Sequence, residues 1–281
     1  MHVGIMVTRV SHYMGRLVFL ARNMLRQQLP KRTSDERFLD VLSDASLKKT
    51  VNSGKKITVT VEGNVGCGKT TFLEYCQQFK DTETLMEPVG RWRDLDGDNL
   101  LELMYKDPRR WGLTFQTYVQ LTMLKLHLIP SSAPVKMMER SIHSARYVFI
   151  ENLYNKGFMQ PTEYRILDEW YQHLLESAPV SIDLIVYLRT DPEVALERIK
   201  LRKRQEEVEM PLDYLKTLHE LHDNWLLGKS KFPLPAKVLV IDANRKLPDL
   251  QREFDRHIPD LILNAQGMAP PTLVPPLQSN S

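Results

Sequence analysis

Eight residues, Gly63 to Thr70, constrain the fold of this chain more than any other feature of its sequence. They read G-N-V-G-C-G-K-T and match the pattern G-x-x-x-x-G-K-[ST] in full. The β-branched run 57–61 precedes them and predicts a strand, and a helical pattern follows over 69–79. Glycines in such a loop let backbone N–H groups converge on phosphate oxygens at the start of a helix. The sequence therefore predicts a P-loop that binds ATP or GTP.

The loop residues have predicted parts in binding the nucleotide. Lys69 would reach the β and γ phosphates, and Thr70 would ligate Mg²⁺. Cys67 is expected to fill space and not to act as a nucleophile. The predicted cofactor-binding residues of the loop are Gly63, Asn64, Val65, Gly66, Cys67, Gly68, Lys69, Thr70 and Thr71.

Strand and helix patterns alternate along the rest of the chain. Short apolar runs predict buried strands, and helical periodicity fills the intervals between them. The expected strands are 57–61, 84–86, 135–138, 182–188 and 237–241, and the expected helices are 69–79, 100–105, 111–129, 162–176, 192–203, 212–227 and 247–263. This alternation predicts an α/β fold, with a five-stranded parallel sheet flanked by helices on both faces.

The positive charge of the chain is concentrated at its N-terminus. The formal net charge is +3, yet residues 1–34 hold six Lys or Arg and no Asp or Glu, so the remainder carries −3. Four of these arginines fall on one arc of a helical projection, and most of the apolar residues fall on the other. Such a segment predicts mitochondrial targeting. The alternative is a basic surface helix or tail, in which case the cytosol is the expected compartment.

The remaining sequence divides into three parts. Residues 35–56 are polar and are expected to form a linker, 57–265 form the folded domain, and 266–281, rich in Pro, Ser and Leu, are expected to be disordered. No stretch approaches the roughly 18 uninterrupted apolar residues of a membrane-spanning helix. We therefore expect no membrane partner. Because the positive charge lies in residues 1–34 and the remainder carries −3, we also expect no nucleic acid as partner. The two cysteines, Cys67 and Cys76, are too few for a disulfide framework.

Charged residues follow two of the predicted strands. Glu87 comes after the second strand, and Glu139 and Arg140 come after the third. In a parallel sheet these strand ends flank the P-loop at one edge, so two carboxylates and an arginine would converge near the γ-phosphate. One carboxylate can accept a proton, another can hold Mg²⁺, and the arginine can stabilise transferred charge. An isolated surface ion pair between Glu139 and Arg140 is the simpler alternative.

Arginines cluster toward the end of the predicted helix 192–203. Arg198, Arg202 and Arg204 are followed by Glu206 and Glu207. Such a run is often a solvated helix face. After a P-loop, however, it favours an arginine-rich lid that closes over the phosphates, as expected of a P-loop kinase. A GTPase is disfavoured: residues 94–97 match D-x-x-G, but no N-K-x-D follows.

Taken together, these motifs resemble the deoxyribonucleoside kinase family, including its mitochondrial thymidine kinase and insect multisubstrate branches. The resemblance extends over about 57–243, with the motifs in the same order and spacing. They are Gly63–Thr71, Glu87–Val89 with Trp92, Leu101–Tyr105, Phe115–Tyr118, Glu139–Tyr147, Tyr187–Thr190 and Arg202–Glu207. The resemblance implies a deoxynucleoside kinase domain over 57–265 that uses ATP and Mg²⁺ and forms a helix-packed homodimer.

The resemblance also implies roles for residues that would otherwise be interpreted as core or surface. Glu87 resembles the base that takes the proton of the 5′-hydroxyl, and Glu139 resembles the Mg²⁺-side carboxylate, although the two assignments can be exchanged. Arg140 would bind Glu87 or the incoming phosphate. The remaining matches are Gln116 for the base edge, Trp92 and Phe149 for the base faces, Tyr105 and Glu207 for the 3′-hydroxyl, Arg198, Arg202 and Arg204 for the lid, and Asp242 near adenine.

Three apolar positions bear on specificity. The deoxycytidine kinase branch has Arg and Asp where this chain has Met123 and Ala145, and with Val119 these side chains leave space for a 5-methyl group. Phosphorylation of the 5′-hydroxyl of thymidine and deoxycytidine in nucleotide salvage is the implied function, with broader substrate use left open. A nucleoside monophosphate kinase and a P-loop NTPase switch acting through a protein partner are the alternatives.

Overall fold

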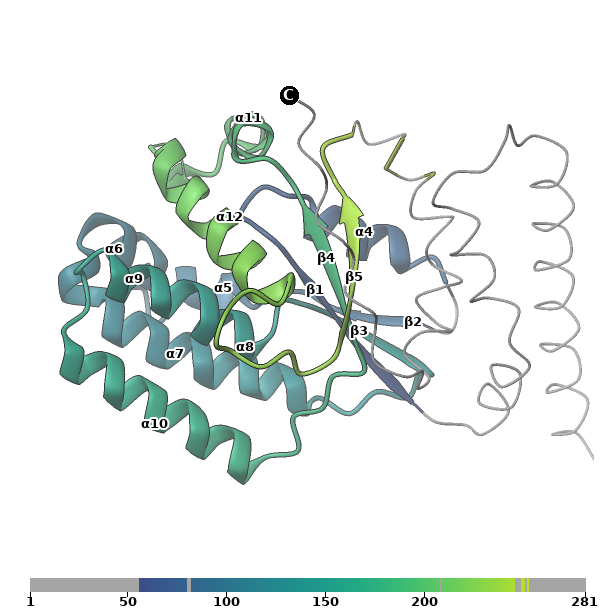
Figure 1. Ribbon diagram of the computed structural model, residues 1–281, viewed down its shortest axis with the longest axis horizontal. Helices are drawn as coiled ribbons and strands as arrows, with labels where there is room; N and C mark the ends of the chain where they lie inside the picture. The colour runs from purple at the N-terminus through teal and green to yellow at the C-terminus, as the bar shows by residue number, and fades with distance from the viewer. Residues whose placement is uncertain (1–55, 80–81, 208, 246–248, 251, 253–281) are drawn as a thin grey trace, which may run out of the picture. The chain divides into compact units, whose positions relative to one another are not determined.

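The structure is a computed structural model and describes residues 56–79, 82–207, 209–245, 249–250 and 252. Five strands form one parallel sheet in the order β2-β3-β1-β4-β5 (Figure 1). They are β1 (Ile57–Glu62), β2 (Thr82–Leu85), β3 (Val135–Glu139), β4 (Leu184–Arg189) and β5 (Lys237–Asp242). The predicted five-stranded parallel sheet is confirmed.

Helices connect the strands. The long ones are α4 (Lys69–Cys76), α7 (Pro108–Leu128), α10 (Pro161–Ser177), α11 (Pro192–Arg202) and α12 (Leu212–Leu226). The short ones are α5 (Val89–Arg93), α6 (Leu100–Lys106), α8 (Ile142–Ser144), the π-helix η1 (Ala145–Ile150), α9 (Glu151–Asn155) and the 3₁₀ turn η2 (Gln205–Glu207). Of these short elements, all except α6 were missed by the periodicity analysis, because segments of three to six residues contain too few turns to show a pattern.

Alternate residues of the central strands enter two separate cores, as expected from the two-residue period of a strand. On one face, Val59 and Val186 pack with Phe72 and Leu73 of α4. On the other face, the sheet packs against α7 and α12, and α10 lies along α7 (Figure 1). Helices therefore cover both faces of the sheet, as predicted, and the strand ends are left at one edge.

Several predicted boundaries were wrong by a few residues, for local reasons. Helix α7 begins at Pro108 and not at Trp111, because Asp107 caps it by accepting a hydrogen bond from the Arg110 N–H at 3.1 Å. Helix α11 ends at Arg202, because Lys203 adopts a left-handed φ of 54°. Arg204 therefore lies in the turn after the helix and not within it.

Some predictions fall on residues that the structure does not describe. These are the targeting segment 1–34, all but the last residue of the linker 35–56, most of the predicted helix 247–263, and the tail 266–281. Among the described residues, no helix is both long and apolar enough to cross a bilayer.

Candidate active site

The P-loop connects β1 to α4 at the carboxyl edge of the sheet. Gly66 and Gly68 have φ values of 79° and 103°, in the region that favours glycine. A Cβ at Gly66 would lie 2.6 Å from the Ala195 carbonyl oxygen. Helix α4 begins at Lys69 without a side-chain cap, so its first N–H groups are available to an anion. The loop fits the triphosphate that its sequence predicts.

Two side chains fix the loop from within. Asn64 Nδ2 donates to the Leu215 carbonyl oxygen of α12 at 2.8 Å, and Asn64 Oδ1 accepts from the Val65 N–H at 2.9 Å. The buried Lys69 Nζ donates to the Asn64 carbonyl oxygen at 2.9 Å. The Lys69 ammonium group has little contact with solvent, so it is placed to form a strong charge-assisted hydrogen bond with a phosphate.

Thr70 and Glu139 meet across the gap between α4 and β3. Thr70 Oγ1 donates to Glu139 Oε1 at 3.0 Å, and the other carboxylate oxygen lies 3.2 Å away. A hydroxyl beside one carboxylate suits Mg²⁺, which takes few protein ligands and completes its shell with water and phosphate oxygens. Within the described ranges, no cluster of three or more His, Cys, Asp or Glu forms a self-contained metal site.

Glu87 and Arg140 form the second charged pair. Arg140 Nε lies 3.2 Å from Glu87 Oε1, and both side chains are largely buried, at 5% exposed for Arg140 and 17% for Glu87. Burial raises the pKa of Glu87, an effect that Arg140 opposes and Glu139 reinforces. Glu139 and Arg140 therefore do not form the isolated surface pair that was the alternative. Glu139 contacts Thr70 of α4, and Arg140 contacts Glu87, which follows β2.

Arg140 also reaches the predicted base wall. Its guanidinium carbon lies 4.7 Å from the centroid of the Phe149 ring, a cation–π distance. The backbone of Arg140 has φ 60°, which is uncommon for a residue other than glycine. One arginine thus links the carboxylate Glu87 to the ring Phe149.

Helix α7 supplies the floor of the predicted base pocket. Trp92 packs edge-on against Phe115, with ring centroids 5.7 Å apart, and Trp92 Nε1 donates to Thr122 Oγ1 at 2.9 Å. Gln116 is 2% exposed, and its Oε1 has no partner within the described part of the chain. The apolar residues predicted to set specificity are buried in the same core cluster as Trp92: Val119, Met123 and Ala145.

The predicted sugar contact and the lid arginines are joined by Glu207. Its carboxylate accepts from Arg202 Nε at 2.7 Å and lies 3.6 Å from Arg204 Nη1. Helix α6, which carries Tyr105, packs against η2, which carries Glu207. Burial, Tyr214 and then Glu207 raise the pKa of Tyr105 well above its usual value. Glu207 is thus shared between the lid and the residue predicted to contact the 3′-hydroxyl.

Arg198 and Asp242 lie at the P-loop side of the sheet edge. Arg198 Nη1 donates to the Cys67 carbonyl oxygen at 3.3 Å, and Nη2 donates to the Arg245 carbonyl oxygen at 2.9 Å. Asp242 ends β5, and its exposed carboxylate accepts from the Asn244 N–H at 3.1 Å. Arg198 therefore contacts the phosphate loop directly, and Asp242 pairs with Arg245, whose carbonyl oxygen Arg198 binds.

Glu62, the last residue of β1, is a further charged residue of the site that the sequence pattern did not predict. Its side chain is fully buried, and its Oε1 accepts from Ser141 Oγ at 2.6 Å. Burial raises the pKa of Glu62 to about 7, although hydrogen bonds from Ser141 and the charge of Arg140 oppose the shift. The available signal was a charged residue at the end of an apolar strand, directly before the P-loop.

A contact between α5 and the lid was not predicted either. Arg93 Nε donates to Glu206 Oε1 at 2.7 Å. Trp92 precedes Arg93, and Glu206 precedes Glu207, so this ion pair joins the predicted base wall to the predicted sugar contact. Two charged side chains more than 100 residues apart give no local pattern from which the pair could have been predicted.

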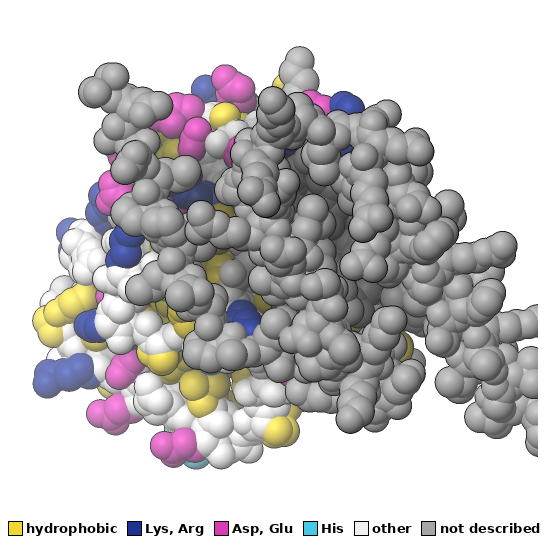
Figure 2. Space-filling view, turned by 45° about the vertical axis from the view of Figure 1, so that its right-hand side comes forward, with side chains coloured by type: hydrophobic (Ala, Val, Ile, Leu, Met, Phe, Trp, Pro, Cys, Tyr) yellow, Lys and Arg dark blue, Asp and Glu magenta, His cyan; other side chains and the backbone are white. Residues whose placement is uncertain are grey.

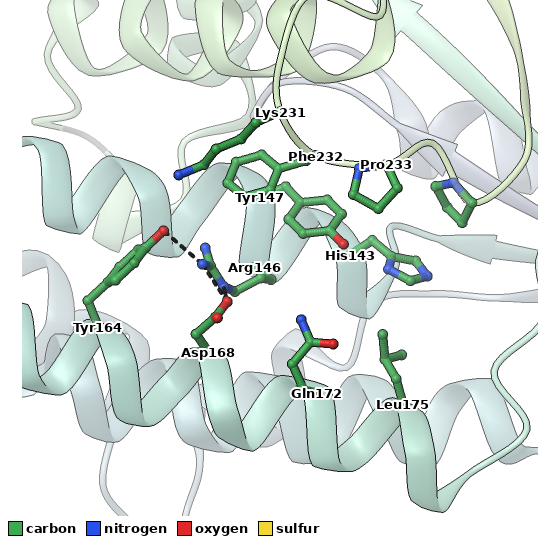
Figure 3. A pocket seen from close by; sticks show the side chains of 11 residues that line it. His143, Arg146, Tyr147, Tyr164, Asp168, Gln172, Leu175, Lys231, Phe232 and Pro233 are labelled. Carbon is green, nitrogen blue, oxygen red and sulfur yellow. Dashed lines mark hydrogen bonds and ion pairs between the residues drawn. The ribbon is translucent and has the colours of Figure 1, made fainter.

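A cavity of about 490 Å³ lies outside this group of residues, between η1, α10 and the loop before β5 (Figure 3). Arg146 is its central charged residue, and it binds Glu151, Tyr164 and Asp168. The Tyr147 ring stacks on Phe232 at 4.4 Å. Arg146 and its partners bind one another, and these contacts stabilise η1, the helix that also carries Ala145 and Phe149. The cavity therefore does not resemble a second catalytic centre.

Charges on the visible surface are mixed. On the part of the face left uncovered in Figure 2, Lys and Arg side chains lie among Asp and Glu side chains and hydrophobic ones. The sequence-based expectation that nucleic acid is not a partner stays a prediction.

Comparison with known proteins decides the family. A profile of the deoxynucleoside kinase family matches residues 59–262. Mitochondrial thymidine kinase 2 of Macaca fascicularis is 51% identical over 203 residues, which cover 72% of this chain and 77% of that protein. The chain belongs to the deoxynucleoside kinase family. Deoxycytidine kinase of Homo sapiens is 35% identical over 221 residues (68% of this chain, 85% of that protein). Mitochondrial deoxyguanosine kinase of Xenopus laevis is 32% identical over 247 residues (79% and 87%).

Family membership confirms the resemblance found in the sequence. The chain is a P-loop α/β kinase that acts on deoxynucleosides, with ATP use implied by the family. Two of these relatives are mitochondrial enzymes, which bears out the expected mitochondrial localisation. The roles of individual residues, Mg²⁺, the substrate preference and the oligomeric state are proposals.

Proposed function

We propose that this deoxynucleoside kinase phosphorylates the 5′-hydroxyl of thymidine and deoxycytidine by in-line transfer from Mg-ATP. The observation that carries the proposal is the largely buried Glu87–Arg140 pair, which follows the strand ends beside the P-loop. A proton acceptor and a cation at that position are what transfer to a neutral alcohol requires.

The contacts favour one division of labour between the two carboxylates. Glu139 is engaged by Thr70, the predicted metal ligand of the P-loop, which suits it to the metal side. Glu87 has a raised pKa, which makes it a stronger base than an ordinary carboxylate. We therefore assign proton removal from the 5′-hydroxyl to Glu87 and metal binding to Thr70 and Glu139. Mg-ATP supplies the γ-phosphoryl group, and Arg140 and Lys69 stabilise its charge.

The pocket lining supports pyrimidine preference. The Gln116 amide offers a donor and an acceptor to a base edge, and its buried Oε1 is left without a partner among the described residues. Met123, Ala145 and Val119 are apolar and buried. A 5-methyl group packed against them would therefore not remove water from a polar side chain, a change that costs free energy. Because one methyl group changes binding by only about 1–3 kcal/mol, thymidine and deoxycytidine are both expected to be substrates.

Phosphate transfer from labelled ATP to the four deoxynucleosides, their ribo counterparts and thymidylate tests the proposal. Thymidine and deoxycytidine should give the highest kcat/KM. Transfer to thymidylate in preference to thymidine would instead indicate a monophosphate kinase. ATP hydrolysis without transfer to any acceptor would indicate an NTPase switch.

We also propose a homodimer formed through α7 and α10. These helices lie against each other, and each exposes large apolar side chains at helical spacing (Figure 1). They are Leu121 and Leu128 on α7, and Ile166 and Trp170 on α10. An isologous helix–helix contact would bury such faces. Sedimentation velocity at micromolar protein tests this, and a monomer at every concentration would refute it.

A further inference from the structure

The residue directly before the P-loop is tied to the turn that carries Arg140. The fully buried Glu62 accepts a hydrogen bond from Ser141 Oγ at 2.6 Å. One residue earlier in β1, the Val61 carbonyl oxygen accepts from the Arg140 N–H at 2.9 Å. Consecutive residues of β1 therefore bind the Arg140 backbone N–H and the side chain of the next residue, Ser141.

The turn at Arg140 needs such support. Arg140 has φ 60°, and a residue other than glycine keeps that conformation only where its surroundings impose it. Ser141 caps α8: its Oγ accepts from the Ser144 N–H at 3.3 Å, while Ser144 Oγ accepts from the Ser141 N–H at 3.3 Å. The Ser141 hydroxyl thus accepts from the helix start and donates to Glu62. It is fixed from both sides.

A carboxylate at this position is not explained by the fold alone. The backbone of β1 is paired with β3 and β4, and a buried carboxylate is costly unless its partners compensate. Only one oxygen of Glu62 is used in the described structure, since Oε2 has no partner there. An apolar side chain would fill the same space but could not accept the hydrogen bond that Ser141 Oγ donates. The carboxylate therefore adds the link to Ser141 and a negative charge near Arg140.

We propose that Glu62 and Ser141 are positioning residues for phosphoryl transfer: the Glu62 carboxylate, acting through the Ser141 hydroxyl, holds Arg140 in the orientation in which it meets Glu87. This inference rests on the proposed function. Because Glu62 also leads directly into Gly63, one residue sets the spacing between the phosphate loop and the Glu87–Arg140 pair.

Three variants separate the hydrogen bond from the charge and from volume. Glu62→Gln keeps an acceptor for Ser141 and should lose less than threefold in kcat. Glu62→Met and Ser141→Ala remove the link and should each lower kcat at least tenfold, while KM for thymidine changes less than threefold. The double variant Glu62→Met/Ser141→Ala should have a kcat no lower than that of the more severe single variant, because both substitutions remove the same interaction. Thr60→Val is the matched control, since Thr60 is buried on the same strand and its Oγ1 lacks a partner among the described residues.

A second readout does not depend on turnover. In nucleotide-free protein, the Arg140 Nε–H NMR signal, identified by its loss in Arg140→Lys, reports the ion pair with Glu87. It should shift in Ser141→Ala and stay in place in Glu62→Gln and Thr60→Val. Normal kcat in Ser141→Ala, equal losses in Glu62→Gln and Glu62→Met, or an unmoved Arg140 signal would each overturn the proposal. Should Glu62→Met fail to fold, Ser141→Ala, which removes a single oxygen, decides alone. Wild-type protein that phosphorylates no deoxynucleoside would contradict the proposed function instead.

Discussion

Substituting Glu87 by Gln tests the proposed chemistry most directly. The amide keeps nearly the same shape and can still accept a hydrogen bond from Arg140 Nε, 3.2 Å away in the wild type. What it loses is the ability to accept a proton from the 5′-hydroxyl. A positioned general base contributes roughly 10²- to 10⁴-fold in rate. At 1.36 kcal/mol for each factor of ten, the transition state should lose about 2.7 to 5.4 kcal/mol of stabilisation.

The substitution should also weaken the fold, but by less than outright removal of one partner. Breaking a buried ion pair by removing one side costs about 3–5 kcal/mol, because it leaves an unpaired charge. In Glu87→Gln the amide retains one polar contact to Arg140, so we expect about 1–3 kcal/mol. The loss of rate and the loss of stability can therefore be measured separately, at a temperature where both proteins are folded.

The assay combines single-turnover phosphate transfer with thymidine binding by calorimetry. Glu87→Gln should bind thymidine within about threefold of wild type and transfer phosphate at least roughly 100-fold more slowly. Glu83→Gln, on β2, the strand that leads to Glu87, is the matched control and should behave as wild type. Because burial raises the pKa of Glu87, the acid limb of kcat/KM should lie above the ordinary glutamate value of about 4.3, and the variant should lack this limb. Turnover within threefold of wild type would refute the assignment of Glu87 as the base.

Three further outcomes are expected. Glu207→Ala should reduce kcat/KM for thymidine at least tenfold more than for 3′-deoxythymidine, and equal losses would contradict its role at the 3′-hydroxyl. Trp170→Glu should shift the dimer to monomer in sedimentation velocity, whereas Glu169→Gln, on the same helix, should not. Burial lowers the pKa of His127 to about 3 and of His143 to about 4, so the unfolded state binds more protons below its own pKa of about 6.5. The free energy of unfolding should therefore fall by about 1.4 kcal/mol per histidine for each pH unit below about 6.5. Urea unfolding measured over this pH range should show that the free energy of unfolding of His127→Gln falls less steeply with pH than that of wild type.

The local features of the site were predictable from the sequence. The P-loop has a fixed spacing because its glycines, Lys69 and Thr70 must meet one small ligand within eight residues. Strand ends followed by Glu87 and by Glu139-Arg140 were visible because apolar runs stop where the sheet reaches solvent. Elements α5, α8 and η1 were not predictable in the same way, since elements of so few residues show no period.

Contacts between distant segments were not predictable in this way. The pairing of Arg93 with Glu206 and the seating of Arg198 on the Cys67 carbonyl depend on where α5, the lid and the P-loop lie in space. Arg140 was expected to bind Glu87 or a phosphate, and only the fold shows the contact with Phe149.

The sequence by itself determined the class of this protein: a phosphate loop between a strand and a helix, an α/β alternation, and carboxylates at strand ends. These signals are local, because each depends on residues within a few turns of one another. The tertiary structure decided how the pieces act together. It placed β1 between β3 and β4, and so brought Glu62 against Ser141 and fixed the turn at Arg140. A buried carboxylate acquires a role only when a partner from another strand reaches it, and that requires the sheet to be assembled.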